Sequence, residues 1–109
     1  MTKLPISINT TQIEACCKKY HITYLALFGS VLTPRFSASS DVDILVKFDK
    51  KHIPGLFGIF DIQQELSAIV GREVDLKTPN SLSRYFRAQV LSEAQVLFKN
   101  ELAKNSPMV

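Results

Sequence analysis

The chain has 109 residues and a mass of 12.2 kDa; 46% of its residues are hydrophobic, 21% are charged, and its formal net charge is +3. These values predict one folded domain over residues 1–109, with a core at about 10–98 and a flexible tail at 105–109, and they exclude a disordered chain. No apolar run approaches the length of a membrane span, and the first residues lack the apolar stretch of a signal peptide. We therefore expect a cytoplasmic protein without a membrane partner. The basic excess is too small and scattered to indicate a nucleic-acid partner.

The two cysteines, Cys16 and Cys17, are adjacent in the chain. Neighbouring cysteines pair poorly with each other, and a disulfide scaffold has more cysteines at spaced positions. No cluster of cysteines and histidines has the ligand spacing of a zinc site. We expect a reducing compartment, with both thiols packed in the core.

The first half of the chain predicts one helix and two strands. Apolar residues recur at helical spacing from Thr11 to Tyr20, and Thr11 with Glu14 has the pattern of a capping box. Residues 24–28 form a short apolar run that ends at a glycine, which is typical of a strand buried on both faces. After a loop at 37–40, residues 41–48 predict a second strand.

The second half predicts two helices around a third strand. The helical pattern of 56–70 ends at Gly71, and 72–77 alternates as a strand does. Ser81 is placed to cap a final helix that starts near Leu82. Whether that helix continues or gives way to a short strand at 95–98 stays open. The fold class is therefore α/β (α+β), a small mixed sheet of three to four strands with flanking helices.

Three aspartates stand out because of their places on the predicted strands. Asp41 and Asp43 are two residues apart, so they project from one face, with roughly 7 Å between their Cα atoms. Asp75 has the same relation to its own strand, and it joins the other two if the strands are neighbours. Like charges this close repel unless a cation holds them, and Mg²⁺ prefers carboxylate oxygens.

A glycine and a serine follow the first predicted strand. Gly29 lets the backbone approach a ligand closely, and Ser30 adds a hydroxyl donor at a turn whose N–H groups can face an anion. Phosphate beside paired carboxylates indicates metal-bridged phosphoryl chemistry. Each element alone is common, and their joint spacing is what carries this hypothesis.

The chain resembles a known family in these segments. The resemblance is to the motifs of minimal nucleotidyltransferases in the DNA polymerase beta superfamily. It lies in Leu27–Ser30, in Asp41–Val46 after a further ten residues, and in Glu73–Leu76. These are the MntA-like proteins, often antitoxins encoded beside a HEPN-domain toxin. The resemblance covers about residues 10–98. It implies the nucleotidyltransferase fold, transfer of AMP from ATP with release of pyrophosphate, two Mg²⁺ ions (Mn²⁺ is an alternative), and a tyrosine of a HEPN toxin as acceptor.

The resemblance also implies roles for individual residues. Asp41 and Asp43 would hold the metal ions, and Asp75 would complete the metal site and help to deprotonate the attacking hydroxyl. Gly29 and Ser30 would bind the terminal phosphates, and Ser40, just before Asp41, also fits the family's nucleotide site.

One departure from the family concerns a phosphate contact. Many members carry arginine one or three positions after the motif serine, where this chain has Val31 and Thr33; the nearest basic residue is Arg35.

The residues also leave other functions open. An antitoxin could neutralise its partner by contact alone, which the missing arginine favours. Exposed apolar residues would favour it too, although burial preferences place the candidates more often in a core than at an interface: Leu56, Phe57, Phe60, Tyr85 and Phe86. A transferase acting on a small-molecule hydroxyl, such as an aminoglycoside, is a third hypothesis, but we see no second domain to hold that acceptor. A plain α/β binding module is the fourth.

Overall fold

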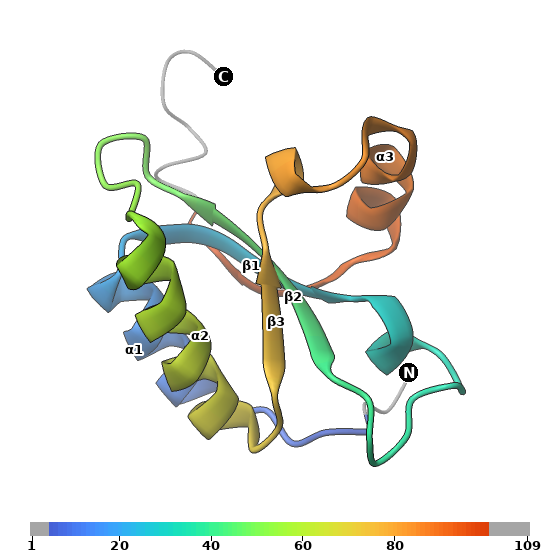
Figure 1. Cartoon of the computed structure of the whole chain (residues 1–109). Coiled ribbons are helices and arrows are strands. Elements are labelled where there is room, and N and C mark those ends of the chain that lie inside the picture. Colours follow the sequence, from blue (N-terminus) through green and yellow to red (C-terminus); the bar gives the residue numbers. More distant parts are fainter. Residues whose placement is uncertain (1–4, 101–109) are drawn as a thin grey trace.

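The computed structural model describes residues 5–100 (Figure 1). The predicted tail at 105–109 lies outside this range. The elements in chain order are α1 (Thr10–Lys19), β1 (Ile22–Phe28), the short 3₁₀ helix η1 (Gly29–Leu32), β2 (Val42–Phe48), α2 (Leu56–Val70), β3 (Val74–Lys77), the 3₁₀ helix η2 (Pro79–Ser81), α3 (Arg84–Glu93) and β4 (Gln95–Lys99). Within 5–100, each helix is too short or too polar to cross a membrane.

The strands form one mixed sheet in the order β3-β2-β1-β4. β1 pairs antiparallel with both β2 and β4, whereas β2 and β3 are parallel. The predicted fold class is confirmed, and the open question at 95–98 resolves to a strand. Figure 1 shows α1 and α2 side by side against one face of the sheet, with α3 and η1 on the other side.

Alternate residues of β2 point into the core that α1 and α2 cover. Val42, Ile44 and Val46 are fully buried and pack in the cluster that α1 and α2 cover. Because successive side chains of a strand point to opposite faces, Asp43 between them faces away from this core. Burial of Val42, Ile44 and Val46 thus determines the face of β2 from which the Asp43 carboxylate projects.

Both cysteines lie in the core, as predicted. Cys16 and Cys17 are buried on the side of α1 that packs against the sheet. Burial raises the pKa of Cys16 to about 11 and that of Cys17 to about 12, so both thiols are protonated at neutral pH. They contribute as small apolar groups, not as nucleophiles.

Two predicted helix starts were wrong. Helix α1 is capped by Asn9, whose side-chain oxygen accepts from the backbone N–H of Gln12 at 3.0 Å, and the Thr11–Glu14 pair lies inside the helix. Helix α3 is capped by Ser83, whereas Ser81 belongs to η2. Asparagine and serine are both strong caps, and sequence alone did not choose between neighbouring candidates. The end of α2 at Gly71, which is left-handed with φ of 73°, is confirmed.

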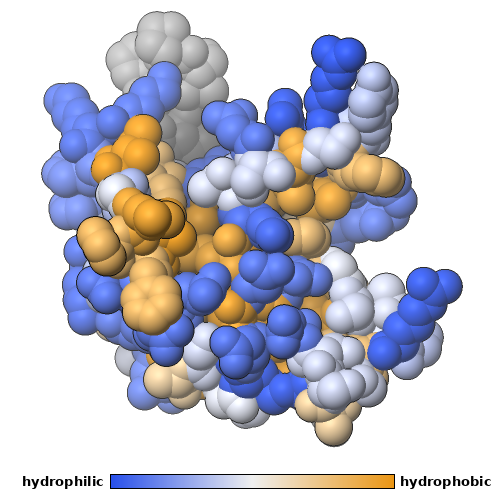
Figure 2. Space-filling model, viewed as in Figure 1, coloured by the Kyte–Doolittle hydropathy of each residue, from blue (hydrophilic) through white to orange (hydrophobic). Residues whose placement is uncertain are grey.

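The expectation that five large hydrophobic residues lie in the core was also wrong. The exposed fractions are 82% for Leu56, 86% for Phe57, 56% for Phe60, 79% for Tyr85 and 61% for Phe86. Helix α2 buries Ile62, Leu66 and Val70, which leaves its first turn facing solvent. We call Ile53, Leu56, Phe57 and Phe60 the α2 surface; Figure 2 shows apolar side chains gathered over α2.

Candidate active site

The candidate site lies where the ends of three strands meet. Asp43 is paired with Phe28, the last residue of β1, and is level with Asp75 on the parallel strand β3. Asp41 precedes β2 by one residue and is exposed. The sheet therefore brings Asp43 beside Asp75, and it places both next to the turn at Gly29.

Gly29 lies directly against the carboxylate of Asp43. Its φ is +78°, and a Cβ built on it would collide with Oδ2 of Asp43. Only glycine adopts this backbone conformation without strain and leaves room for the carboxylate. Gly29, which was identified from sequence, therefore makes room for the Asp43 carboxylate in addition to forming the turn. Ser30, the second residue of η1, comes immediately after it.

Electrostatic repulsion is concentrated at Asp43. Burial, then the nearby charges of Asp75 and Asp41, raise the pKa of the Asp43 carboxyl, while Lys77 acts in the opposite direction. Lys77 Nζ lies 3.5 Å from Oδ2 of Asp75. A divalent cation would relieve this repulsion, and oxygen donors of this kind suit Mg²⁺ or Mn²⁺.

The residues present fit such an ion, with one rearrangement. Over residues 5–100, no three acidic, histidine or cysteine side chains already converge as a ready-made ligand set. Asp75 is held by Lys77, so it would exchange this ammonium for the ion.

Two polar side chains of α2 hold β3 at its free edge. The backbone N–H of Val74 donates to Ser67 Oγ at 3.0 Å, and that of Leu76 donates to Gln63 Oε1 at 3.1 Å. These bonds satisfy donors that a parallel edge strand would otherwise leave unpaired. They fix Asp75, which lies between the two bonded residues. Neither residue was predicted to support the site, although two polar positions four residues apart on an otherwise apolar helix face were a signal.

Arg72 holds the loop that leads to Asp41. Its Nη2 donates to the carbonyl oxygens of Ser37 at 2.8 Å and Ser40 at 2.7 Å. Its guanidinium also lies over the ring of Phe36, 4.5 Å from the centroid. Arg72 was not predicted from sequence, because contacts to carbonyls more than thirty positions away leave no local pattern.

Ser40 has a structural role in the same loop. Its hydroxyl accepts from the backbone N–H of Ser37 at 3.0 Å, and its carbonyl accepts from Arg72. This hydrogen bonding stabilises the turn before β2. The structure thus places Ser40 beside Asp41 but turns its hydroxyl into the loop.

We expect Arg72→Ala to weaken the metal site through Asp41. Without the guanidinium, the loop loses its tie to the start of β3, and the Mg²⁺ concentration needed for half-maximal activity should rise about tenfold. Hydrogen exchange of residues 37–41 should accelerate in the same variant. Lys18→Ala on α1 is the control, since Lys18 is exposed and pairs with Glu14 of its own helix. Unchanged exchange and metal dependence would show that Arg72 does not position Asp41.

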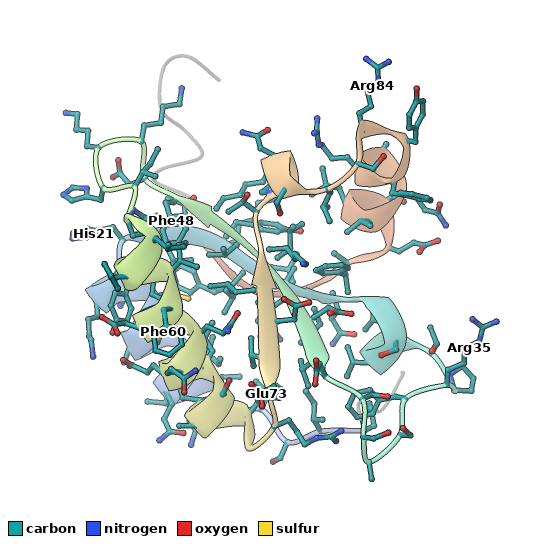
Figure 3. All side chains as sticks on the ribbon, in the orientation of Figure 1. His21, Arg35, Phe48, Phe60, Glu73 and Arg84 are labelled. Carbon is teal, nitrogen blue, oxygen red and sulfur yellow. The ribbon has the colours of Figure 1, made fainter. Side chains whose placement is uncertain are left out.

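A pocket of about 780 Å³ opens beside the Gly29–Ser30 turn. Thr33 and Arg35 line it near that turn, and side chains of α3 form the facing wall. Figure 2 shows a hollow between α3 and the loop after η1, and Figure 3 shows Arg35 projecting from this loop on the same side of the molecule as α3. The volume lies in the range of ligand pockets.

The sequence from residue 11 to residue 102 matches the family described as Polymerase beta, Nucleotidyltransferase. The chain belongs to this nucleotidyltransferase family. The family resemblance inferred from the aspartate and Gly-Ser motifs is therefore confirmed.

One relative of this nucleotidyltransferase is a protein adenylyltransferase. The protein adenylyltransferase MntA of Thermococcus cleftensis is 32% identical over 87 residues, which are 80% of this chain and 86% of the relative.

Solved structures of similar fold come from toxin–antitoxin complexes. A toxin–antitoxin structure with AMP-PNP has a TM-score of 0.68 at 21% identity, covering 90% of this chain and 79% of the matched chain. A complex of tri-AMPylated HEPN toxin with MNT antitoxin from Shewanella oneidensis has a TM-score of 0.60 at 20% identity, covering 88% and 74%. At these identities the likeness establishes the fold that the nucleotidyltransferase shares with them.

Proposed function

We propose that this nucleotidyltransferase is a protein adenylyltransferase that acts as an antitoxin, transferring AMP from ATP to a tyrosine hydroxyl of a HEPN-type toxin in a reaction that needs a divalent cation. The observation that carries the proposal is the register that puts Asp43 level with Asp75 and against Gly29. The name of the Thermococcus relative and the HEPN–MNT complexes of similar fold support the activity and the partner.

In the proposed reaction, the tyrosine oxygen attacks the α-phosphorus of ATP. The bond from this phosphorus to the oxygen that bridges to the β-phosphate breaks, and pyrophosphate leaves. Asp75 accepts the proton of the tyrosine hydroxyl. Gly29 and Ser30 bind the terminal phosphates, with Ser40 shaping the loop beside them.

Asp41, Asp43 and Asp75 would hold the cation. It supplies positive charge that offsets the charge developing on the phosphoryl oxygens.

Label transfer tests this function. The protein is incubated with α-phosphate-labelled ATP, Mg²⁺ and the HEPN-type partner, beside Asp43→Asn. Label on the partner with the wild type, and none with the variant, supports the proposal. A partner that stays unlabelled with the wild type would contradict it.

A second function, neutralisation by contact alone, has its own observation. The α2 surface presents four large apolar side chains that are each more than half exposed, which is typical of an interaction site. The family's arginine is absent as well: Val31 is 2% exposed, so an arginine there would need to bury its charge in the core. Thr33 instead donates its hydroxyl to the carbonyl of Ser30 at 2.9 Å.

The two functions separate in one set of variants. If contact suffices, a chain with all three aspartates changed to asparagine still silences the toxin, whereas Phe57→Ser with Phe60→Ser releases it. If transfer is required, the triple variant fails while the α2 variant keeps modifying a partner supplied in excess. Toxin RNase activity in both mixtures is the measurement, and Gln64→Ser, on the exposed side of α2, is the control.

A further inference from the structure

One face of α3 lines the pocket beside the candidate site. Phe86, Gln89, Val90 and Glu93 follow each other at helical spacing and all line the pocket, whereas no residue of α3 is buried. We call these four residues the α3 face. A helix that turns an aromatic and an aliphatic side chain toward a pocket, and not into the core, offers a surface for an apolar, planar group.

The charges of the pocket set the direction of a bound nucleotide. Among the residues that line it, Arg35 carries the positive charge near the Gly29–Ser30 turn, and Glu93 carries the negative charge on α3. A triphosphate is attracted to Arg35 and repelled by Glu93. The uncharged base is therefore the part of the nucleotide that faces α3.

The polar groups of the α3 face suit an adenine edge. Gln89 Nε2 donates to Oε2 of Glu93 at 3.4 Å, which leaves Gln89 one further N–H donor and its carbonyl oxygen. A glutamine amide that still has one N–H and its carbonyl oxygen available matches the adjacent acceptor and donor of adenine. The remaining carboxylate oxygen of Glu93 can accept a hydrogen bond from the exocyclic amino group of adenine. Guanine carries a carbonyl oxygen in place of this amino group. That oxygen is an acceptor and would face the acceptor oxygens of Gln89 and Glu93.

We propose that the α3 face binds the base of the nucleotide, with Phe86 and Val90 packing against its plane and Gln89 with Glu93 selecting adenine over guanine. This inference rests on the proposed nucleotidyl transfer and adds residues that decide which nucleotide is used. It also gives Arg35 a place at the phosphate end of the pocket, two positions beyond Thr33.

Calorimetric titration of the full chain with AMP-PNP and with GMP-PNP, both in Mg²⁺, tests the inference. We expect the wild type to bind AMP-PNP at least about tenfold more tightly than GMP-PNP. Phe86→Ala should weaken AMP-PNP binding about tenfold, because base–aromatic stacking is lost. The pair Gln89→Leu and Glu93→Gln should bring the ratio of the two affinities close to one.

The controls are matched in chemistry and exposure. Tyr85→Ala removes another exposed aromatic side chain of α3, and Gln64→Leu removes another exposed glutamine, on α2; neither residue lines the pocket. Both should bind the analogues as the wild type does. Circular dichroism confirms that each variant is folded, which we expect because the α3 face has no buried residue.

Each outcome separates this inference from the proposed function. Any of three results would overturn the inference. Phe86→Ala could bind AMP-PNP as tightly as the wild type does, the double variant could keep the preference for AMP-PNP, or the wild type could prefer GMP-PNP. If label transfer to the partner persists alongside such a result, the proposed function stands. If the α3 variants behave as expected but the wild type transfers no label, the proposed AMP transfer to the partner is contradicted, whereas the base-binding role of the α3 face is supported.

Discussion

Asp43→Asn is expected to abolish AMP transfer and, in metal-free buffer, to raise the unfolding temperature of the protein. Transfer should fall by at least about a hundredfold, since the variant loses a charged ligand at the reacting phosphate. The same substitution should increase the thermal stability. Burial and Asp75 raise the pKa of the Asp43 carboxyl, so the ionised form opposes folding, and removing its charge should raise the Tm by a few degrees.

The pH dependence follows from the direction of that pKa change. The folded-state pKa lies above the ordinary value, so the destabilisation is complete above the folded-state pKa. It disappears below the ordinary pKa of an aspartate, where both states are protonated. The Tm difference between variant and wild type should therefore shrink as the pH falls.

Adding Mg²⁺ separates the metal site from a general charge effect. The wild type should gain Tm on addition of Mg²⁺, and Asp43→Asn should gain much less, because a ligand that binds only the folded state stabilises it. Asp61→Asn, an exposed carboxylate on α2, is the control and should leave both Tm and transfer unchanged. A metal-free Asp43→Asn that melts below the wild type would contradict the repulsion inferred at this site.

Gly29→Ala is expected to leave a folded protein that no longer transfers AMP. The new methyl group meets Oδ2 and Cγ of Asp43, so the carboxylate must turn away from the place where it would hold the cation. The alanine also has to adopt a φ of +78°, which costs about 1 kcal/mol. We expect transfer to fall about a hundredfold, with Mg²⁺ stabilisation lost in parallel.

Gly71→Ala is a close control for this variant. Gly71 has a φ of +73°, yet a Cβ there meets no atom within 4 Å. It therefore carries the same backbone strain without the collision. Both variants should lose Tm, Gly29→Ala at least as much as Gly71→Ala, and only Gly29→Ala should lose transfer in the label assay. Equal loss of transfer in both would mean that strain, and not the contact with Asp43, explains the effect.

Local patterns predicted the strands well and the helix caps poorly. Apolar alternation placed Asp43 and Asp75 on the polar side of their strands, because the buried face of a strand leaves no choice for the other. The caps failed because Asn9 and Ser83 compete with neighbours of similar capping strength. Burial failed at Phe57 because the general burial preference of phenylalanine does not say where the sheet that would cover it ends.

Residues that support the site from a distance were beyond the sequence. Arg72 reaches carbonyls of a loop more than thirty positions earlier in the chain, and Gln63 bonds a strand thirteen positions later. Nothing in a local pattern links a guanidinium or an amide to one particular backbone group. Such contacts follow from packing, and packing depends on the whole chain.

Local sequence singled out the candidate groups, three aspartates at strand spacing and a Gly-Ser turn, because each depends only on its immediate neighbours. Which of these groups lie together became clear only from the fold. The parallel pairing of β2 with β3 puts Asp75 level with Asp43, and the left-handed Gly29 lies against its carboxylate. The same packing left α3 unburied beside a pocket. Strand order and helix placement result from the combined burial of distant segments, which no single stretch of sequence encodes.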